Sequence, residues 1–215
     1  MAALAEKLRQ FKSSFDASTP TEILETINRS ISLFQQENVC QTCLITGSTF
    51  PSFTLNNLQG NVTELTQLVQ DKPLVITFIR GGWCPYCVLE MQAWQSYYKA
   101  SFEEFNIVAI TPEFPEFSSQ LQKDNNISFP ILIDKGLQLV SKLGLVWSLD
   151  ADMQDLLLKW NIDLTKRSCE TKFNVPIPAT FVIDKDLTIK YRFIEEDYTI
   201  RAEPSDVIKA YQALL

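Results

Sequence analysis

Residues 74–79 form an unbroken apolar run, LVITFI, that stops abruptly at Gly81 and Gly82. A run of this length and composition is typical of a central strand covered on both faces. Cys84-Pro85 then opens a segment with helical apolar spacing that reaches about Phe105. Proline is acceptable in a first helical turn because its missing N–H would be unpaired there. The sequence therefore predicts a buried strand that leads through a short loop into a long helix.

The same alternation continues along the chain. Apolar runs and periodic segments predict a hairpin within residues 51–65, strands at 107–110 and 130–133, helices at 117–124, 137–143 and 151–160, a terminal hairpin around 184–186, and a closing helix from Pro204. Strands that alternate with helices indicate right-handed crossovers onto a largely parallel sheet. The polar stretch 165–171 indicates an insertion or a flexible lid. We expect an α/β fold with one main domain.

Two further helices precede this domain. Apolar residues recur at helical spacing from Ala2 to about Phe15 and from Thr21 to about Gln36. We therefore divide the chain into an N-terminal helical extension, residues 1–44, and a domain of residues 45–215. A chain of 215 residues suits one core with extensions. The two helices either pack on the sheet or form a homodimer, and the sequence does not choose between these.

Composition excludes several classes of function. The chain contains no histidine, which rules out a Ser-His-Asp triad, a Cys-His dyad and a histidine proton shuttle. A net charge of −7 argues against a nucleic-acid surface. Charged residues near the N-terminus interrupt any signal-peptide pattern, and no apolar run approaches a membrane span. We expect a cytoplasmic protein, where cysteines are more often catalytic or metal-binding than structural.

Cys84 and Cys87 lie at the predicted junction between strand and helix. Unpaired N–H groups and the helix dipole stabilise a thiolate at such a position and lower the pKa of the cysteine. Cys84 is therefore the candidate nucleophile. Cys87, one turn further on, is more sheltered and is the candidate resolving thiol.

Three neighbours of this pair are candidate supporting residues. Trp83 is expected to shield the dithiol, and Pro85 to fix the turn. Arg80 either adds positive charge to the site or is a solvated cation at the end of the strand.

The remaining cysteines leave their roles open. Cys40 and Cys43 form a second CxxC pair, which is a redox relay, half of a zinc site, or two reduced thiols in a linker. Cys169 is a distant resolving cysteine or an exposed thiol. We predict no cofactor and no resident metal.

The sequence Trp83-Cys84-Pro85-Tyr86-Cys87 resembles a thioredoxin-fold active site. This resemblance implies an α/β thioredoxin-like fold with a central mixed sheet flanked by helices. Ile177-Pro178-Ala179-Thr180 resembles the cis-proline loop of that fold, so the resemblance implies that Pro178 faces the dithiol through a cis peptide bond. The acid that thioredoxins bury six residues before the first cysteine is replaced by Phe78, so the usual proton acceptor for the second thiol is missing.

The wider pattern is similar to the peroxiredoxin-like branch of the alkyl hydroperoxide reductase C/thiol-specific antioxidant (AhpC/TSA) family. It runs from Pro51-Ser-Phe-Thr-Leu through the Trp-Cys-Pro-Tyr-Cys segment to Phe129-Pro-Ile-Leu-Ile-Asp and Pro178-Ala-Thr-Phe-Val-Ile-Asp. The proline and threonine that precede the reactive cysteine of true peroxiredoxins are Thr77 and Gly81 here, and the arginine before the terminal strand is Pro178. Peroxide reduction is therefore the less favoured interpretation.

Three functions follow as hypotheses. The first is a thiol-disulfide oxidoreductase that uses Cys84 and Cys87 and is recharged by an external thiol donor such as a thioredoxin or glutathione system. The second is a peroxiredoxin-like peroxidase that reduces hydroperoxides through a sulfenic acid on Cys84. The third is a binding module that senses redox state or zinc.

Overall fold

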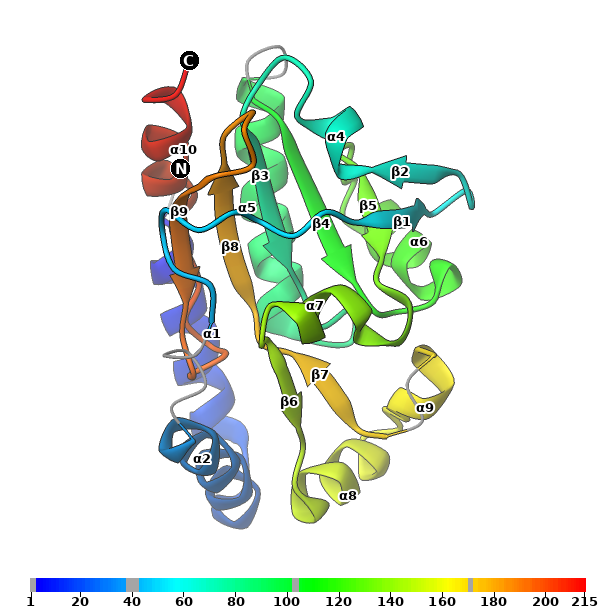
Figure 1. Ribbon diagram of the computed structural model, residues 1–215. Coiled ribbons are helices and arrows are strands. Elements are labelled where there is room, and N and C mark those ends of the chain that lie inside the picture. The colour runs from blue at the N-terminus through cyan, green and yellow to red at the C-terminus, as the bar shows by residue number, and fades with distance from the viewer. Residues whose placement is uncertain (1–2, 38–42, 102–104, 170–171) are drawn as a thin grey trace.

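The computed structural model describes residues 3–37, 43–101, 105–169 and 172–215. Among them, seven strands form one sheet: β1 (Thr54–Asn57), β2 (Val62–Glu64), β3 (Leu74–Phe78), β4 (Ile107–Thr111), β5 (Ile131–Ile133), β8 (Ala179–Ile183) and β9 (Ile189–Ile194). They are hydrogen-bonded in the order β2-β1-β5-β4-β3-β8-β9, which puts β3 inside the sheet (Figure 1). The predicted strand at residues 74–79 is thus confirmed.

The sheet is mixed. The pairs β3–β4 and β4–β5 are parallel, whereas β1 and β2 at one side and β8 and β9 at the other pair antiparallel. The central mixed sheet that the resemblance implies is confirmed. The alternation of strands and helices by itself favoured a largely parallel sheet, but the predicted hairpins join this sheet, and a short hairpin connection permits only antiparallel pairing. The predicted α/β thioredoxin-like class is confirmed.

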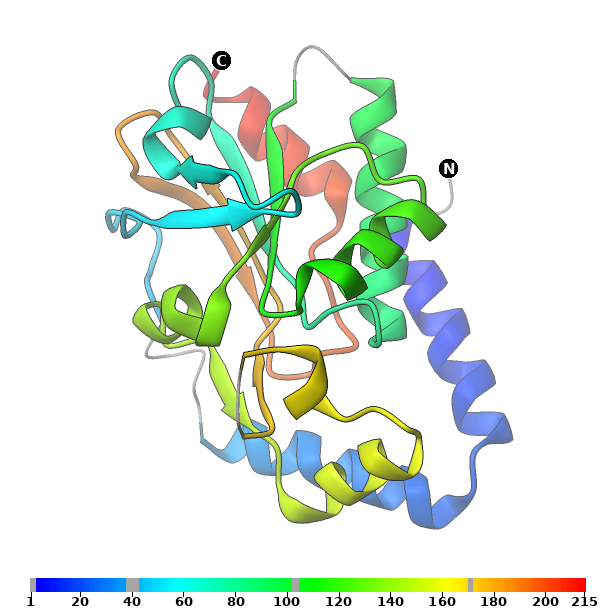
Figure 2. The same cartoon turned by 90° about the vertical axis from the view of Figure 1, so that its right-hand side faces the viewer.

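Helices cover both faces of the sheet (Figures 1 and 2). The described helices include α1 (Leu4–Ser18), α2 (Thr21–Gln36), α4 (Leu65–Leu68), α5 (Pro85–Ala100), α6 (Pro115–Asp124), the 3-10 turn η1 (Lys135–Leu137), α7 (Gln138–Lys142), α8 (Ala151–Lys159), α9 (Leu164–Arg167) and α10 (Pro204–Gln212). Buried residues of α1, α5, α6 and α10 form one hydrophobic cluster, and those of α2, α7 and α8 form another.

Alternate side chains of β3 contribute to the two hydrophobic clusters. Leu74, Ile76 and Phe78 belong to the cluster with α7, whereas Val75 and Ile79 belong to the cluster with α5. Successive strand residues point to opposite faces of a sheet. Cys84 and Cys87, at the start of α5, belong to this second cluster.

Residues 144–176 contain the predicted helix at 151–160, observed as α8, and two strands that the sequence did not predict. Strands β6 (Val146–Ser148) and β7 (Asn174–Pro176) form a separate two-stranded antiparallel sheet. Between them, α8 and α9 complete a small layer below the main sheet in Figure 1. The stretch 165–171 was expected as an insertion or lid, but its first three residues belong to α9; residues 170–171 lie outside the described part of the chain.

The N-terminal helices pack within the chain. Helix α1 contacts α5, and α2 contacts α8, where Arg29 and Asp152 form an ion pair. Figure 2 shows α1 continuing past the end of α5 and α2 crossing beneath the sheet next to α8. The carboxylate of Glu203 accepts hydrogen bonds from the backbone N–H groups of Leu4 and Ala5, which joins the first helix to the start of the last.

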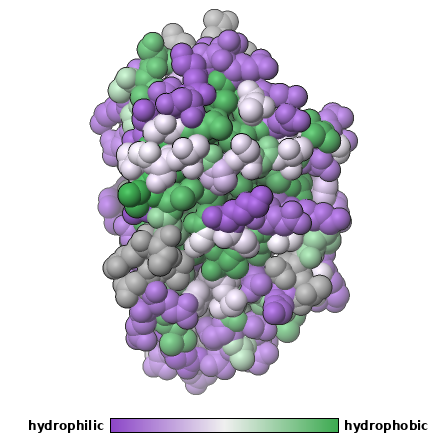
Figure 3. All heavy atoms as spheres, viewed as in Figure 1, coloured by the Kyte–Doolittle hydropathy of each residue, from purple (hydrophilic) through white to green (hydrophobic). Residues whose placement is uncertain are grey.

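The molecular face seen in Figure 3 mixes hydrophilic and hydrophobic residues. Large exposed apolar side chains such as Ile45, Val62 and Leu158 come from separate elements, and single exposed apolar residues are normal on protein surfaces. Within the described residues, no helix combines the length and apolar character that a membrane crossing requires.

Candidate active site

Cys84 occupies the N-cap position of α5, and Pro85 is the first residue of the helix. A short loop connects the end of β3 to Cys84. Gly81 in this loop has φ +134°, a conformation that side-chain-bearing residues rarely adopt, and an added Cβ would lie 2.6 Å from the carboxyl carbon of Glu113. The predicted strand–loop–helix junction is therefore present, and glycine at position 81 is a steric requirement.

The nearby Cys87 side chain is the largest influence on the pKa of Cys84. Together with the positive charges of Arg201 and Arg80, it outweighs burial and lowers that pKa to about 6. At neutral pH Cys84 is consequently a thiolate, although only 2% of its surface is exposed.

The second cysteine has the opposite character. Burial raises the pKa of Cys87 well above its usual value, and the adjacent Cys84 raises it further. The sulfur of Cys87 also accepts two N–H groups, one from the backbone of Arg80 at 3.4 Å and one from the Arg201 side chain at 3.6 Å. Cys87 is therefore a protonated thiol with two donors placed to stabilise it when it ionises.

A buried ion pair that the sequence analysis missed lies beneath this dithiol. Arg201 donates to Glu90 at 2.8 Å, and their side chains are 2% and 1% exposed. Glu90 also accepts hydrogen bonds from the hydroxyl of Thr77 and the indole of Trp94. Burial raises the pKa of Glu90, and Arg201 opposes that rise. The site thus has a buried acid, which comes from α5 rather than from the strand position occupied by Phe78.

Arg80 is buried, which rules out the interpretation of this residue as a solvated cation at the end of the strand. Its Nε donates to the carbonyl of Pro176 at 3.3 Å, and its guanidinium lies 4.1 Å from the ring centre of Tyr198. Burial lowers the pKa of Arg80, whereas the neighbouring Cys84 raises it. An arginine side chain stays charged even so. Arg80 therefore supplies positive charge to the site.

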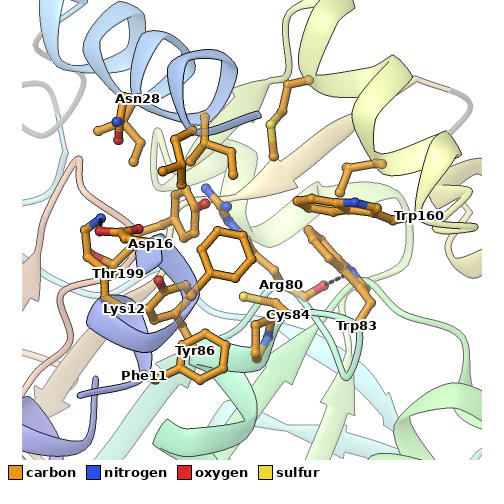
Figure 4. Close-up of a pocket in the computed structure, with 18 of the residues that line it drawn as sticks. Phe11, Lys12, Asp16, Asn28, Arg80, Trp83, Cys84, Tyr86, Trp160 and Thr199 are labelled. Atoms are coloured by element: carbon orange, nitrogen blue, oxygen red, sulfur yellow. Dashed lines mark hydrogen bonds and ion pairs between the residues drawn. The ribbon is translucent and has the colours of Figure 1, made fainter. Parts of the chain in front are cut away.

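The remaining supporting residues take different positions. The indole of Trp83 donates to the carbonyl of Arg80 at 3.2 Å, which holds the ring over the loop (Figure 4). Pro178 is buried one residue before β8, whose Ala179 pairs with Phe78 at the end of β3. The bond before Pro178 is trans, so the expected cis form was wrong. Ile177 donates to Leu145 at 2.8 Å, and this bond holds the chain extended from β7 into β8.

A second ion pair fastens the loop from outside. Glu113, which follows β4, accepts the backbone N–H of Gly82 at 2.7 Å and the guanidinium of Arg167 at 2.6 Å. The Arg167 guanidinium also lies 4.1 Å from the ring centre of Phe117. The segment that was expected to be a lid therefore helps to hold the loop before Cys84.

A cavity of about 210 Å³ lies directly over Cys84 (Figure 4). The N-terminal helices supply part of its wall: the ring of Phe11 contacts Tyr86 edge-on at 5.2 Å between centroids, and Phe15 contacts Trp160 edge-on at 6.3 Å. Tyr86 in turn contacts Tyr198 at 5.7 Å. The extension thus completes the surroundings of the candidate nucleophile.

The other cysteines lie elsewhere. Cys43 is buried in the cluster with α7, and its thiol lies 3.5 Å from the carbonyl oxygen of Gly144. Cys169 is exposed. Cys40 lies outside the described residues, so its pairing with Cys43 stays a prediction. Among the described residues, no three His, Cys, Asp or Glu side chains are grouped as metal ligands.

Comparison with known proteins identifies a family and a relative that this chain resembles. Residues 46–192 match the AhpC/TSA family. A protein named thiol-disulfide oxidoreductase ResA from Halalkalibacterium halodurans is 34% identical over 96 residues, which cover 44% of this chain and 53% of that protein. The matched segment therefore spans about half the length of this relative.

Two solved structures share the fold. Peroxidoxin BcpB from Mycobacterium tuberculosis superimposes with a TM-score of 0.60 at 20% identity, over 79% of this chain and 95% of that one. A peroxiredoxin-like protein from Aquifex aeolicus gives a TM-score of 0.63 at 16% identity, over 80% and 88% of the two chains. At such identities the likeness concerns the fold, and chemistry has to be argued from the site.

Proposed function

Because this chain belongs to the AhpC/TSA family, we propose that it is a thiol-disulfide oxidoreductase in which Cys84 is the nucleophile and Cys87 the resolving thiol. The position of Cys84 at the N-cap of α5, with the buried Cys87 one turn into the helix, carries the proposal, since there the pKa of Cys84 is lowered to about 6 and that of Cys87 is raised. The relative named as a thiol-disulfide oxidoreductase supports the same class of reaction.

The first step is attack by the Cys84 thiolate on a substrate disulfide. A bond forms between the sulfur of Cys84 and one substrate sulfur while the substrate S–S bond breaks. The other substrate sulfur leaves as a thiolate and takes a proton from solvent. Arg80 and Arg201 keep the attacking sulfur ionised until this step.

The first step prepares the second. Before it, burial raises the pKa of Cys87, and the charge of the adjacent Cys84 raises it further. Once Cys84 is bound in a mixed disulfide, its negative charge is gone and this second contribution is lost. The N–H donors from Arg80 and Arg201 remain, so Cys87 ionises more readily and attacks Cys84. The second substrate thiolate leaves, and a Cys84–Cys87 disulfide results.

Regeneration requires two electrons from outside the chain. An external dithiol, or two monothiols, reduces the Cys84–Cys87 disulfide by the same exchange chemistry. Because Cys84 is only 2% exposed, a small thiol that reaches it would serve as this donor.

The test is a single-turnover reaction of the reduced protein with bis(2-hydroxyethyl) disulfide, followed by mass spectrometry of intact protein and peptides. The native chain should end with a Cys84–Cys87 disulfide. Cys87→Ser should stop at a mixed disulfide on Cys84, and Cys84→Ser should lose the fast reaction. Cys169→Ser is the matched control and should behave as the native chain, because Cys169 is an exposed thiol that does not line the cavity over Cys84.

Exposed Cys169 also provides an internal reference for the rate. Cys84 should react faster than Cys169 at pH 7, since the lowered pKa of Cys84 makes it a thiolate there. Equal rates at the two positions, or an adduct that persists on Cys84 in the native chain, would overturn the proposal.

Hydroperoxide reduction is a second candidate, favoured by the two guanidinium groups whose charge acts on Cys84. In that reaction Cys84 would become a sulfenic acid and condense with Cys87, releasing water. The same single-turnover assay with hydrogen peroxide separates the two. A second-order rate constant for peroxide above that for the disulfide would favour the peroxidase.

A further inference from the structure

The cavity over Cys84 admits a ligand to the nucleophile but not to the resolving thiol. Cys84 is part of its wall, whereas Cys87, which is fully buried, is not. Helices α1 and α2 close the cavity on the side away from the sheet, through Phe11, Phe15 and Leu24 among others. A substrate therefore meets Cys84 in a space bounded by the N-terminal helices.

The size of this space limits what fits. A cavity of about 150 Å³ accommodates benzene, and sites for drug-sized molecules start at roughly 300 Å³. At about 210 Å³, the cavity suits a group the size of one substituted ring. A disulfide within a folded protein would have to bring its own backbone under α1 and α2, and Cys84 is only 2% exposed.

The chemistry of the wall favours a neutral, apolar group. Aromatic side chains line the cavity together with Cys84, namely Phe11, Phe15, Trp83, Tyr86, Trp160 and Tyr198. The charged side chains of the wall already have partners. Lys12 and Asp16 pair with each other at 2.8 Å, and the Arg80 guanidinium lies over the ring of Tyr198. An anionic arm, as in oxidised glutathione, would compete with the Cys84 thiolate for Arg80.

We propose that the substrate of this site is a small organic disulfide with an uncharged apolar arm, about one aromatic ring in size, that enters the cavity formed with α1 and α2. This inference rests on the proposed thiol-disulfide activity and specifies its substrate class. Cys84 bonds to the sulfur that carries the apolar arm, and the other half leaves as a thiolate and is protonated by solvent. Cys87 then attacks Cys84, the apolar thiol is released, and two electrons have passed from the dithiol to the substrate.

The experiment compares two uncharged dialkyl disulfides, dibenzyl disulfide and bis(2-hydroxyethyl) disulfide, in single turnovers with the reduced full chain. Each rate constant is divided by that for the same disulfide with dithiothreitol, which removes differences in intrinsic reactivity. The normalised preference for dibenzyl disulfide should be about tenfold or more, as expected for burying a ring.

A pair of matched variants on α2 tests whether the cavity causes the preference. Leu24→Trp fills the cavity, whereas Leu33→Trp makes the same change at an exposed position of the same helix. Leu24→Trp should lose the preference for dibenzyl disulfide, and Leu33→Trp should keep both this preference and the native rate with bis(2-hydroxyethyl) disulfide. Ile31→Trp fills the cavity further along the helix and serves if Leu24→Trp fails to fold by circular dichroism.

The outcomes separate this inference from the proposed function. Rapid reaction through Cys84 with no preference, or a preference that survives Leu24→Trp and Ile31→Trp, overturns the substrate class and leaves the oxidoreductase intact. If Cys84→Ser reacts as fast as the native chain with both disulfides, the proposed function fails and the inference fails with it.

Discussion

Two buried glutamates, each paired with an arginine, flank the loop that carries Cys84, and their surroundings differ. Glu90 and Arg201 are both almost completely buried, and Arg201 reaches the sulfur of Cys87. Glu113 is equally buried, but its partner Arg167 is 24% exposed, and the pair holds the backbone of Gly82 instead of a thiol. The comparison teaches that similar ion pairs perform different tasks: Arg201 of the first pair acts on the pKa values of the dithiol, and the second pair fixes the geometry of the loop.

The largest effect should follow from breaking the inner pair. Arg201→Leu leaves the carboxylate of Glu90 buried without its cation, which should lower the free energy of unfolding by about 3–5 kcal/mol at neutral pH. Urea denaturation measures this. The double variant Glu90→Leu/Arg201→Leu should regain most of the loss, because no unpaired charge remains. If Arg201→Leu were as stable as the native chain, the ion pair between Glu90 and Arg201 would not contribute to stability as described.

The loop itself should be nearly as sensitive. Gly81→Ala combines a disfavoured φ of +134° with a Cβ 2.6 Å from the Glu113 carboxyl carbon, and should cost about 1–3 kcal/mol. Gly60→Ala is the matched control, since Gly60 has φ +83° but open space where an added Cβ would lie. Thermal or urea unfolding should show the larger loss for Gly81→Ala. Equal losses of stability in the two variants would mean that backbone strain alone causes the loss and that the Glu113 side chain moves away from the added methyl group.

The outer pair should tolerate removal of its arginine better than the inner pair. Arg167→Gln should cost about 1–2 kcal/mol, because Glu113 keeps its bond from Gly82 and water can reach the vacated position. Lys166→Gln, at the exposed neighbouring position, is the control and should be neutral. A loss from Arg167→Gln as large as that from Arg201→Leu would abolish the distinction drawn between the two pairs.

The pH dependence of alkylation gives the finest measure of the distinction. Because the pKa of Cys84 is about 6, its iodoacetamide rate should rise with pH through a midpoint near 6, below which the thiol is protonated. Arg201→Gln should move the midpoint upward, since Arg201 lowers that pKa, whereas Arg167→Gln should leave it in place. An unchanged midpoint in Arg201→Gln would contradict the electrostatic role of the inner pair.

The dithiol was predictable because its signals are local. Cys84, Pro85 and Cys87 are neighbours in sequence, and the apolar run before them identifies a buried strand. Arg201 lies 114 residues beyond Cys87, and the residues next to it in sequence do not indicate that it contacts Cys87. For Glu90 a signal did exist: it lies on the same helical face as Cys87 and Trp94, and a charged residue on an apolar face indicates a buried partner.

Two features of the fold could not be predicted from the sequence, for physical reasons. Strands β6 and β7 have three residues each, and Pro176 within β7 weakens a strand pattern. Periodicity predicted the N-terminal helices, with the bounds of α2 correct, but it cannot say which surface an apolar face covers. Docking of α1 on α5 depends on the shapes of both surfaces, which no single segment encodes.

The row of aromatic rings from Trp160 through Phe15, Phe11 and Tyr86 to Tyr198 crosses the limits of the family match, residues 46–192. A trimmed version of the protein that kept only the matched region would retain both thiols of the dithiol yet discard Phe11, Tyr198 and Arg201. Anyone who transplants this dithiol into another scaffold must therefore carry both ends of the chain along with it.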